Sequence, residues 1–175
     1  LSQIKGNQKA TIEMALKDKD DNIRGMALRI ARQHKLDVIG LIKQLADEES
    51  ALVRRECLVA IRHNKSKEAP ALWAKLANAH DGKDRWYLEA LGLAADKQEN
   101  KFFDAWVRGA KLNTAAARDI IWRNRGTHGA KFLADIVLDE KTTEAEKPRY
   151  LRALDFIPKG KEKDDALARI ALGAL

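Results

Sequence analysis

The chain has 175 residues, of which 45% are hydrophobic, and a formal net charge of +7. This length suffices for one domain with a sizeable core, and no linker or composition break divides residues 1–175. The single cysteine, Cys57, excludes an internal disulfide framework and a multi-cysteine metal site. The sequence contains no run of 18 apolar residues, the length needed for a membrane-spanning helix. The sequence opens LSQIKGNQ without an initiator methionine, so we interpret it as a piece excised from a longer multidomain protein.

The composition favours helix over sheet, because alanine and leucine dominate the apolar residues and only three prolines and ten glycines occur. Apolar periodicity predicts helices at 7–17, 21–34, 36–46, 51–64, 69–79, 82–96, 100–110, 114–126, 129–139, 144–156 and 162–173. Asp20 or Asp21, Ser50 and Thr143 are expected to cap the helices that follow them, and Pro148 fits an early helical position. The side chains expected to point inward from the first helix are those of Ile12, Met14, Ala15 and Leu16.

Five of the predicted helices resemble one another, and each carries an arginine in its first half. The recurring arginines, separated by 30, 31, 33 and 31 residues, are Arg24, Arg54, Arg85, Arg118 and Arg149. A period near 31 predicts an array of helical hairpins, each too small to bury its own apolar stripe, so that neighbours must stack. The sequence therefore predicts about five hairpins followed by a terminal helix.

The hairpins resemble HEAT repeats, which have an aspartate in the turn and an arginine early in the second helix. The turn aspartates are Asp20, Asp47, Asp81 and Asp139, whereas the fourth unit has Asn113. The resemblance covers nearly the whole chain. It implies an all-α fold in the form of a right-handed α–α superhelix, a HEAT/armadillo-like solenoid, with the second helices lining the concave wall.

A narrower resemblance involves the runs AHDGKDRWYLEALG, FFDAW, DIIWR and RYLRALDF. They are similar to the helical-repeat region of large extracytoplasmic proteins from planctomycete-type and Bacteroidetes-type bacteria. In that family a dehydrogenase-like β-propeller precedes the repeats and a haem c domain with a CxxCH motif follows them. The resemblance implies a middle module of a membrane-bound dehydrogenase–cytochrome c fusion, in a periplasmic or extracytoplasmic location. Because this chain has no CxxCH, we expect no cofactor in this domain.

Twelve of the 14 arginines fall on the arginine-bearing helices. A concave strip of arginines could hold an acidic protein partner, a peptide or a phosphate-bearing ligand. The alternative is a ladder of ion pairs between repeats, for which Asp21, Glu56, Glu89, Asp119 and Asp155 are available. The binding residues that the pattern predicts are Arg29, Arg32, Arg55, Arg62, Arg85, Trp86 and Arg123.

The tryptophans and histidines are assigned by alignment of the repeats. Trp73, Trp106 and Trp122 occupy apolar positions and are expected in the core, whereas Trp86 falls in a polar column and is expected on the surface. His34 and His63 hold equivalent helix-terminal places, which allows a two-histidine metal site or simply a favourable helix dipole. Neither has a metal-site spacing such as HExxH, so no metal is expected.

The sequence contains no catalytic constellation, and the leading hypothesis is a non-enzymatic scaffold for the flanking domains or for a protein partner. The alternative is a nucleic-acid-binding or base-excising module similar to the alkylpurine DNA glycosylases of this architecture. Asp119 near Trp122 would then supply the acid. Nucleic acid is the less favoured partner. A third hypothesis, a lyase or chaperone for a tetrapyrrole, rests on fold analogy alone.

Overall fold

The computed structural model describes residues 7–173, and this part of the chain is all-helical. It contains eleven α-helices, one 3-10 helix and no strand, which confirms the predicted all-α class. The α-helices are α2 (Gln8–Leu16), α3 (Asp21–Gln33), α4 (Val38–Leu45), α5 (Ala51–Ile61), α6 (Ala69–Asn78), α7 (Arg85–Ala94), α8 (Glu99–Val107), α9 (Ala115–Arg123), α10 (Ala130–Leu138), α11 (Lys147–Asp155) and α12 (Lys161–Gly173). The 3-10 helix η1 is Thr127–Gly129.

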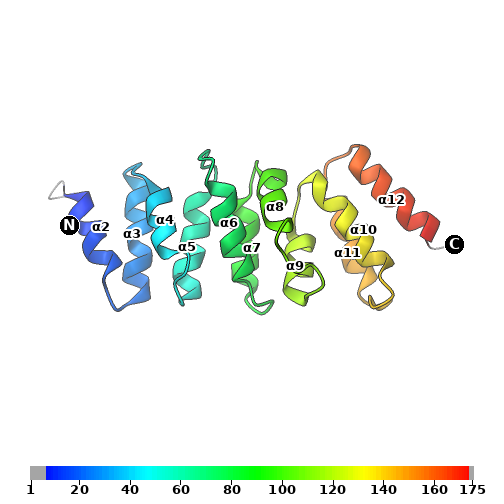
Figure 1. Cartoon of the computed structure of the whole chain (residues 1–175), viewed down its shortest axis with the longest axis horizontal. Helices are drawn as coiled ribbons and strands as arrows, with labels where there is room; N and C mark the ends of the chain where they lie inside the picture. The colour runs from blue at the N-terminus through cyan, green and yellow to red at the C-terminus, as the bar shows by residue number, and fades with distance from the viewer. Residues whose placement is uncertain (1–6, 174–175) are drawn as a thin grey trace.

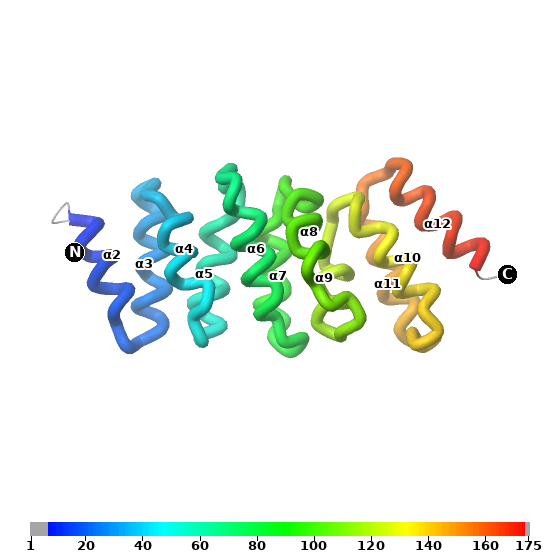
Figure 2. Tube along the Cα trace, viewed as in Figure 1, coloured from blue at the N-terminus to red at the C-terminus, as the bar shows by residue number. Residues whose placement is uncertain are grey.

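The helices stand side by side in one elongated row, with α2 and α12 at opposite ends (Figure 1). Helices α3, α5, α7, α9 and α11 each contact the next in this series, and we call them the odd-numbered layer. Helices α4, α6 and α8 follow one another in the same way on the other side, and α10 contacts α12. The Cα trace shows the chain passing back and forth between the two layers along the row (Figure 2). Each helix is therefore packed chiefly against its sequence neighbour and against the next member of its own layer.

Side-chain caps set the starts of α3, α5, α7 and α9. Asp20 accepts a hydrogen bond from the Asn22 amide at 2.8 Å, and Ser50 accepts one from Val53. Asp84 and Thr114 do the same for α7 and α9. Each cap satisfies an amide that has no acceptor within its own helix. The expected caps at Asp20 and Ser50 are confirmed.

Helix α11 begins at Lys147, three residues later than predicted. Thr143 does not cap the helix directly; its amide and hydroxyl both donate to the Glu146 carboxylate, which closes a turn. Backbone hydrogen bonds to Thr143 lower the pKa of Glu146, since they favour the charged carboxylate. Pro148 lies in the first turn of the helix, where its missing N–H costs no hydrogen bond.

An aromatic cluster forms the centre of the core between α6 and α8. Trp73, Phe102, Phe103 and Trp106 are almost completely buried. The indole of Trp73 donates to the Leu91 carbonyl at 3.0 Å, so the buried N–H has an acceptor. The expected burial of Trp73 and Trp106 is confirmed.

Met14 is wrongly predicted to point inward, because its side chain is 76% exposed. Helix α2 packs mainly against α3, and it buries Ile12 and Ala15 there. Helical periodicity fixes which side chains share a face but not whether a neighbour covers that face.

In the described part of the chain, no helix is long and apolar enough to cross a membrane.

Candidate functional site

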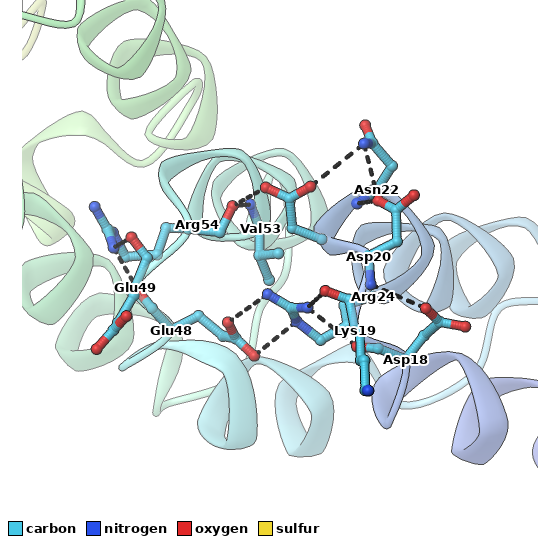
Figure 3. A network of polar contacts seen from close by, with 11 residues as sticks. Asp18, Lys19, Asp20, Asn22, Arg24, Glu48, Glu49, Val53 and Arg54 are labelled. Carbon is cyan, nitrogen blue, oxygen red and sulfur yellow. Dashed lines mark hydrogen bonds and ion pairs between the residues drawn. The ribbon is translucent and has the colours of Figure 1, made fainter.

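Two of the five recurring arginines bind the turn that precedes their own helix. Arg24 donates through Nη1 to the carbonyls of Asp18 and Lys19, and through Nε and Nη2 to both carboxylate oxygens of Glu48 (Figure 3). Arg54 repeats the first contact by donating to the carbonyls of Glu48 and Glu49. Both arginines satisfy loop carbonyls, and Arg24 also attaches its hairpin to the next one through Glu48, so their role is structural.

Two more recurring arginines also bind neighbouring hairpins. Arg118 donates to Asp139 at 2.5 Å and to the Thr142 hydroxyl at 2.8 Å. Arg149 donates to Asp119 at 2.6 Å. Arg85, at the equivalent place in α7, is different: it is exposed, and no hydrogen bond or ion pair of its side chain occurs within residues 7–173.

Ion pairs connect every adjacent pair of helices in the odd-numbered layer. They are Arg29–Glu56 at 2.5 Å, Arg55–Asp84 at 3.8 Å, Arg62–Asp96 at 2.6 Å, Arg123–Glu89 at 2.9 Å and Arg149–Asp119 at 2.6 Å. Four of the seven predicted binding residues are among them. For these four, the structure thus contains the ladder of ion pairs that was the alternative to a binding strip. Such partly exposed pairs contribute little to the free energy of unfolding, so they align the helices more than they stabilise them.

The other three predicted binding residues lie open on the surface. Trp86 is 71% exposed, as expected from its polar column. Arg85 precedes it, and Arg32 is exposed near the end of α3. The structure does not bring the seven predicted binding residues together into one site. Arg85 lines a hollow of about 400 Å³ together with Asp119, Trp122 and Arg149, whereas the neighbouring Trp86 does not line it.

The Asp119 side chain, the candidate acid of the base-excision hypothesis, lies in this same hollow. One of its oxygens accepts from Arg149, and the other is 3.8 Å from Nε2 of His80. His80 is buried against Tyr87 with the rings stacked, and neither of its ring nitrogens has a hydrogen-bond partner in the described part of the chain. Trp122 packs partly against the core, and the Arg149 guanidinium lies 4.5 Å from its ring centroid.

A second hollow, of about 260 Å³, opens between α7 and α9, and we call it the α7–α9 hollow. Its apolar lining comes from Trp73, Leu88, Leu91, Leu93, Ala95 and Ile120. Its charged lining comes from Arg62, Asp96, Glu99, Arg123 and Arg125. It therefore combines two predicted binding arginines with a third, Arg125, that the repeat alignment did not single out.

Gly92 positions the arginine at the edge of this hollow. A Cβ atom on Gly92 would lie 2.3 Å from Cζ of Arg123, so the guanidinium rests directly on the backbone of α7. Its Nε donates to Glu89. Only glycine leaves this space, and a glycine in a helix interior costs about 0.5–1 kcal/mol relative to alanine.

Arg125 follows α9 and reaches back over its end. Its Nη1 donates to the carbonyls of Trp122 and Asn124, and its guanidinium lies 4.8 Å from the Phe156 ring centroid. Burial, and then the nearby Arg123 charge, lower the pKa of Arg125. No carboxylate forms an ion pair with it in the region that the structure describes. Its position could not be inferred from α9 alone, because Phe156 comes from the end of the next hairpin.

The histidines and the cysteine lie apart from any cluster of potential metal ligands in the described part of the chain. His63 pairs with Asp96, and residues 7–173 contain no group of three potential ligands. Cys57 is buried, and burial raises the pKa of its thiol to about 12, far from the thiolate that a metal or a haem linkage requires.

Comparison with known proteins gives no match: no family model, no curated protein and no solved structure matches the chain.

Proposed function

We propose that the chain is a non-enzymatic helical-repeat scaffold that holds other domains or a protein partner along its odd-numbered layer. The observation that supports this is the row of helices in which each member of that layer forms an ion pair with the next. Such a row is extended, and its surface can contact a partner over several repeats. In this proposal the hairpins wind as a right-handed HEAT-like superhelix, with the odd-numbered layer on the concave side.

The parent protein in this proposal is a dehydrogenase–haem c fusion of the type that the sequence resembles, with this chain as its middle domain and no cofactor of its own. The propeller and the haem domain would then be held at a fixed separation by the row. Rigidity matters for that role, because a flexible linker of the same length would let both domains diffuse freely.

Cross-linking within the full-length parent protein tests the scaffold. Lysine-reactive cross-links should join the repeat domain to both flanking domains, and the same cross-links should form when the three domains are mixed as separate proteins. Absence of any inter-domain cross-link in the full-length protein would remove the scaffold role. Small-angle scattering of the isolated chain should give an elongated particle.

The second candidate function is the nucleic-acid or base-excision module, and it rests on the hollow that contains Asp119, Trp122, Arg85 and Lys83. The Arg149–Asp119 ion pair weighs against it, since a carboxylate bound to an arginine is less available for the chemistry. A salt titration of binding to duplex DNA separates the two functions. A phosphate-binding surface must lose affinity steeply between 50 and 200 mM salt, and a scaffold binds no DNA at either concentration.

A further inference from the structure

The α7–α9 hollow contains arginine N–H donors that have no acceptor in the part of the chain that the structure describes. Arg123 uses Nε for Glu89, while its Nη1 and Nη2 have no acceptor in the described residues. Arg125 uses Nη1 for two carbonyls, while its Nε and Nη2 have none there. Two adjacent guanidinium groups with free N–H donors repel each other, and an anion placed between them would remove this repulsion.

The two carboxylates that line the hollow are already engaged. Asp96 accepts hydrogen bonds from Arg62 and His63 through the same oxygen. Glu99 accepts one from the Lys97 amide at 3.1 Å. Neither carboxylate is hydrogen-bonded to Arg123 or Arg125 in this part of the chain. The remaining N–H groups of the two arginines are therefore available to an external acceptor.

Apart from Asn124, the rest of the lining is apolar, and this limits the kinds of molecule that can carry the acceptor. Trp73 and Leu91 are almost fully buried, and Leu88 and Ile120 are buried beside them. A volume of about 260 Å³ is smaller than the roughly 300–1,000 Å³ of pockets for drug-sized ligands, so it suits one large side chain. An inorganic phosphate or a nucleic-acid backbone has no apolar part to fill this space.

We propose that the α7–α9 hollow binds the carboxy-terminal residue of a protein partner, with the carboxylate held by Arg123 and Arg125 and an apolar side chain seated between α7 and α9. This assignment rests on the proposed scaffold function and specifies the chemistry of the partner. A chain terminus places a carboxylate and an apolar side chain on the same carbon, which matches the proximity of the arginines to the apolar lining. Gly92 is the positioning residue, since it allows the Arg123 guanidinium to lie at the edge of the hollow.

The test uses nuclear magnetic resonance titrations of the ¹⁵N-labelled chain with N-acetylphenylalanine, its amide, acetyl-Gly-Gly-Phe and inorganic phosphate at constant ionic strength. The free acid should shift the Gly92 amide and the Nε–Hε signals of Arg123 and Arg125. It should bind at least about tenfold more tightly than the amide, because only the acid forms charge-assisted hydrogen bonds. Equal binding of acid and amide would overturn the role of the arginines.

The remaining probes separate the sources of a carboxylate. Acetyl-Gly-Gly-Phe should bind at least as tightly as N-acetylphenylalanine if the site receives a peptide terminus. Weaker binding of the tripeptide would identify a small-molecule carboxylate site and overturn the proposal. Phosphate binding as tight as that of the acid would identify a general anion site, which also overturns it.

Variants establish which arginine acts. Arg125→Gln should weaken binding of the acid by about tenfold or more, and Arg125→Lys should restore part of it. Gly92→Ala should weaken binding by displacing the Arg123 guanidinium, with the helix content unchanged by circular dichroism. Arg108→Gln is the matched control, since it removes an exposed arginine that does not line the hollow and should leave binding unchanged.

Failure of this assignment and failure of the scaffold are distinguishable. Inter-domain cross-links without binding of any carboxylate would leave the scaffold standing and remove the terminus site. Specific binding of acetyl-Gly-Gly-Phe without inter-domain cross-links would support the site and show that the partner is not a flanking domain.

Discussion

The contact between α3 and α5 and the contact between α7 and α9, which we call seams, both join neighbouring helices of the odd-numbered layer, yet they differ in how completely their polar groups are paired. In the first, Arg24 and Arg29 both bind glutamates of the next hairpin, and the Ser50 hydroxyl donates to Asp21. In the second, Arg123 and Arg125 keep N–H donors that have no acceptor within residues 7–173. Three of the four buried polar atoms without a partner in the described residues also lie beside this seam, on His80 and Asn124.

This contrast separates the features that both seams share from the unpaired polar groups that gather beside the α7–α9 seam. Both seams bury apolar side chains and contain an ion pair between the two helices. Unpaired buried polar groups cost free energy, so they persist in a fold for some other reason. We therefore expect a functional site at the α7–α9 hollow rather than elsewhere in the row.

The largest expected effect compares one leucine from each seam. Leu58→Ala removes a fully buried side chain from α5 and should lower the free energy of unfolding by about 3–5 kcal/mol. Leu91→Ala enlarges a hollow that already exists in α7, so solvent can fill the new space and the loss should be about 2–3 kcal/mol. Urea unfolding followed by circular dichroism measures both. Equal losses would show that the two seams are packed alike.

The second comparison uses the recurring arginines. Arg24→Gln breaks a hydrogen-bonded contact to Glu48 and two loop carbonyls at a side chain that is 17% exposed, and it should cost about 1–3 kcal/mol. Arg85→Gln, at the equivalent position of α7, should change stability by no more than about 0.5 kcal/mol, because this arginine is exposed. Thermal unfolding of the two variants side by side is the measurement. A comparable loss at Arg85 would mean that it binds its own turn in solution as Arg24 does.

The third comparison concerns how well each seam excludes solvent. Cys57 on α5 has a pKa raised from 9.0 to about 12 by burial. Between pH 9 and 12 the unfolded chain releases the thiol proton and the folded chain keeps it. The free energy of unfolding should therefore fall by about 1.4 kcal/mol per pH unit in this window. Lysines titrate there too, so the effect is the difference in slope between the wild type and Cys57→Ala, and identical slopes would contradict the burial.

A thiol placed in the other seam gives the matched measurement. Leu93 lines the α7–α9 hollow and is 38% exposed. In a Cys57→Ala background, Leu93→Cys should react with a thiol reagent at pH 8 within minutes, whereas native Cys57 should react only on unfolding.

The positions of the helices could be predicted from the sequence, because apolar periodicity and capping residues are local features. The starts at Asp20 and Ser50 depend on residues within one turn, and both were predicted. The late start of α11 was not, since the turn closed by Glu146 competes with the helix that Thr143 could have capped. Met14 was misplaced for a different reason: α2 packs mainly against α3, and this contact buries Ile12 and Ala15 but leaves the Met14 side chain exposed.

The candidate site depended on contacts that repeat alignment cannot supply. Aligned positions give Arg24 and Arg85 the same expected role, but only Arg24 has an acceptor in the next turn. Arg125 was missed because the groups that hold it come from Phe156 and from two carbonyls at the end of α9. The exposure of Trp86 was predictable, since its column in the alignment is polar.

The smallest expected effect compares the ion pairs of the two seams. Arg29→Gln removes a pair whose arginine is 55% exposed, so the free energy of unfolding should fall by no more than about 1 kcal/mol, and this loss should vanish near 1 M salt. Arg123→Gln removes an ion pair of the same kind but also removes the charge that repels Arg125. The two contributions oppose each other, so Arg123→Gln should be closer to neutral than Arg29→Gln at low salt. Denaturant midpoints at 20 mM and 1 M sodium chloride make the comparison. A larger loss for Arg123→Gln at low salt would show that Arg125 is not destabilised by its neighbour, and the hollow would then have no excess positive charge for an anion to neutralise.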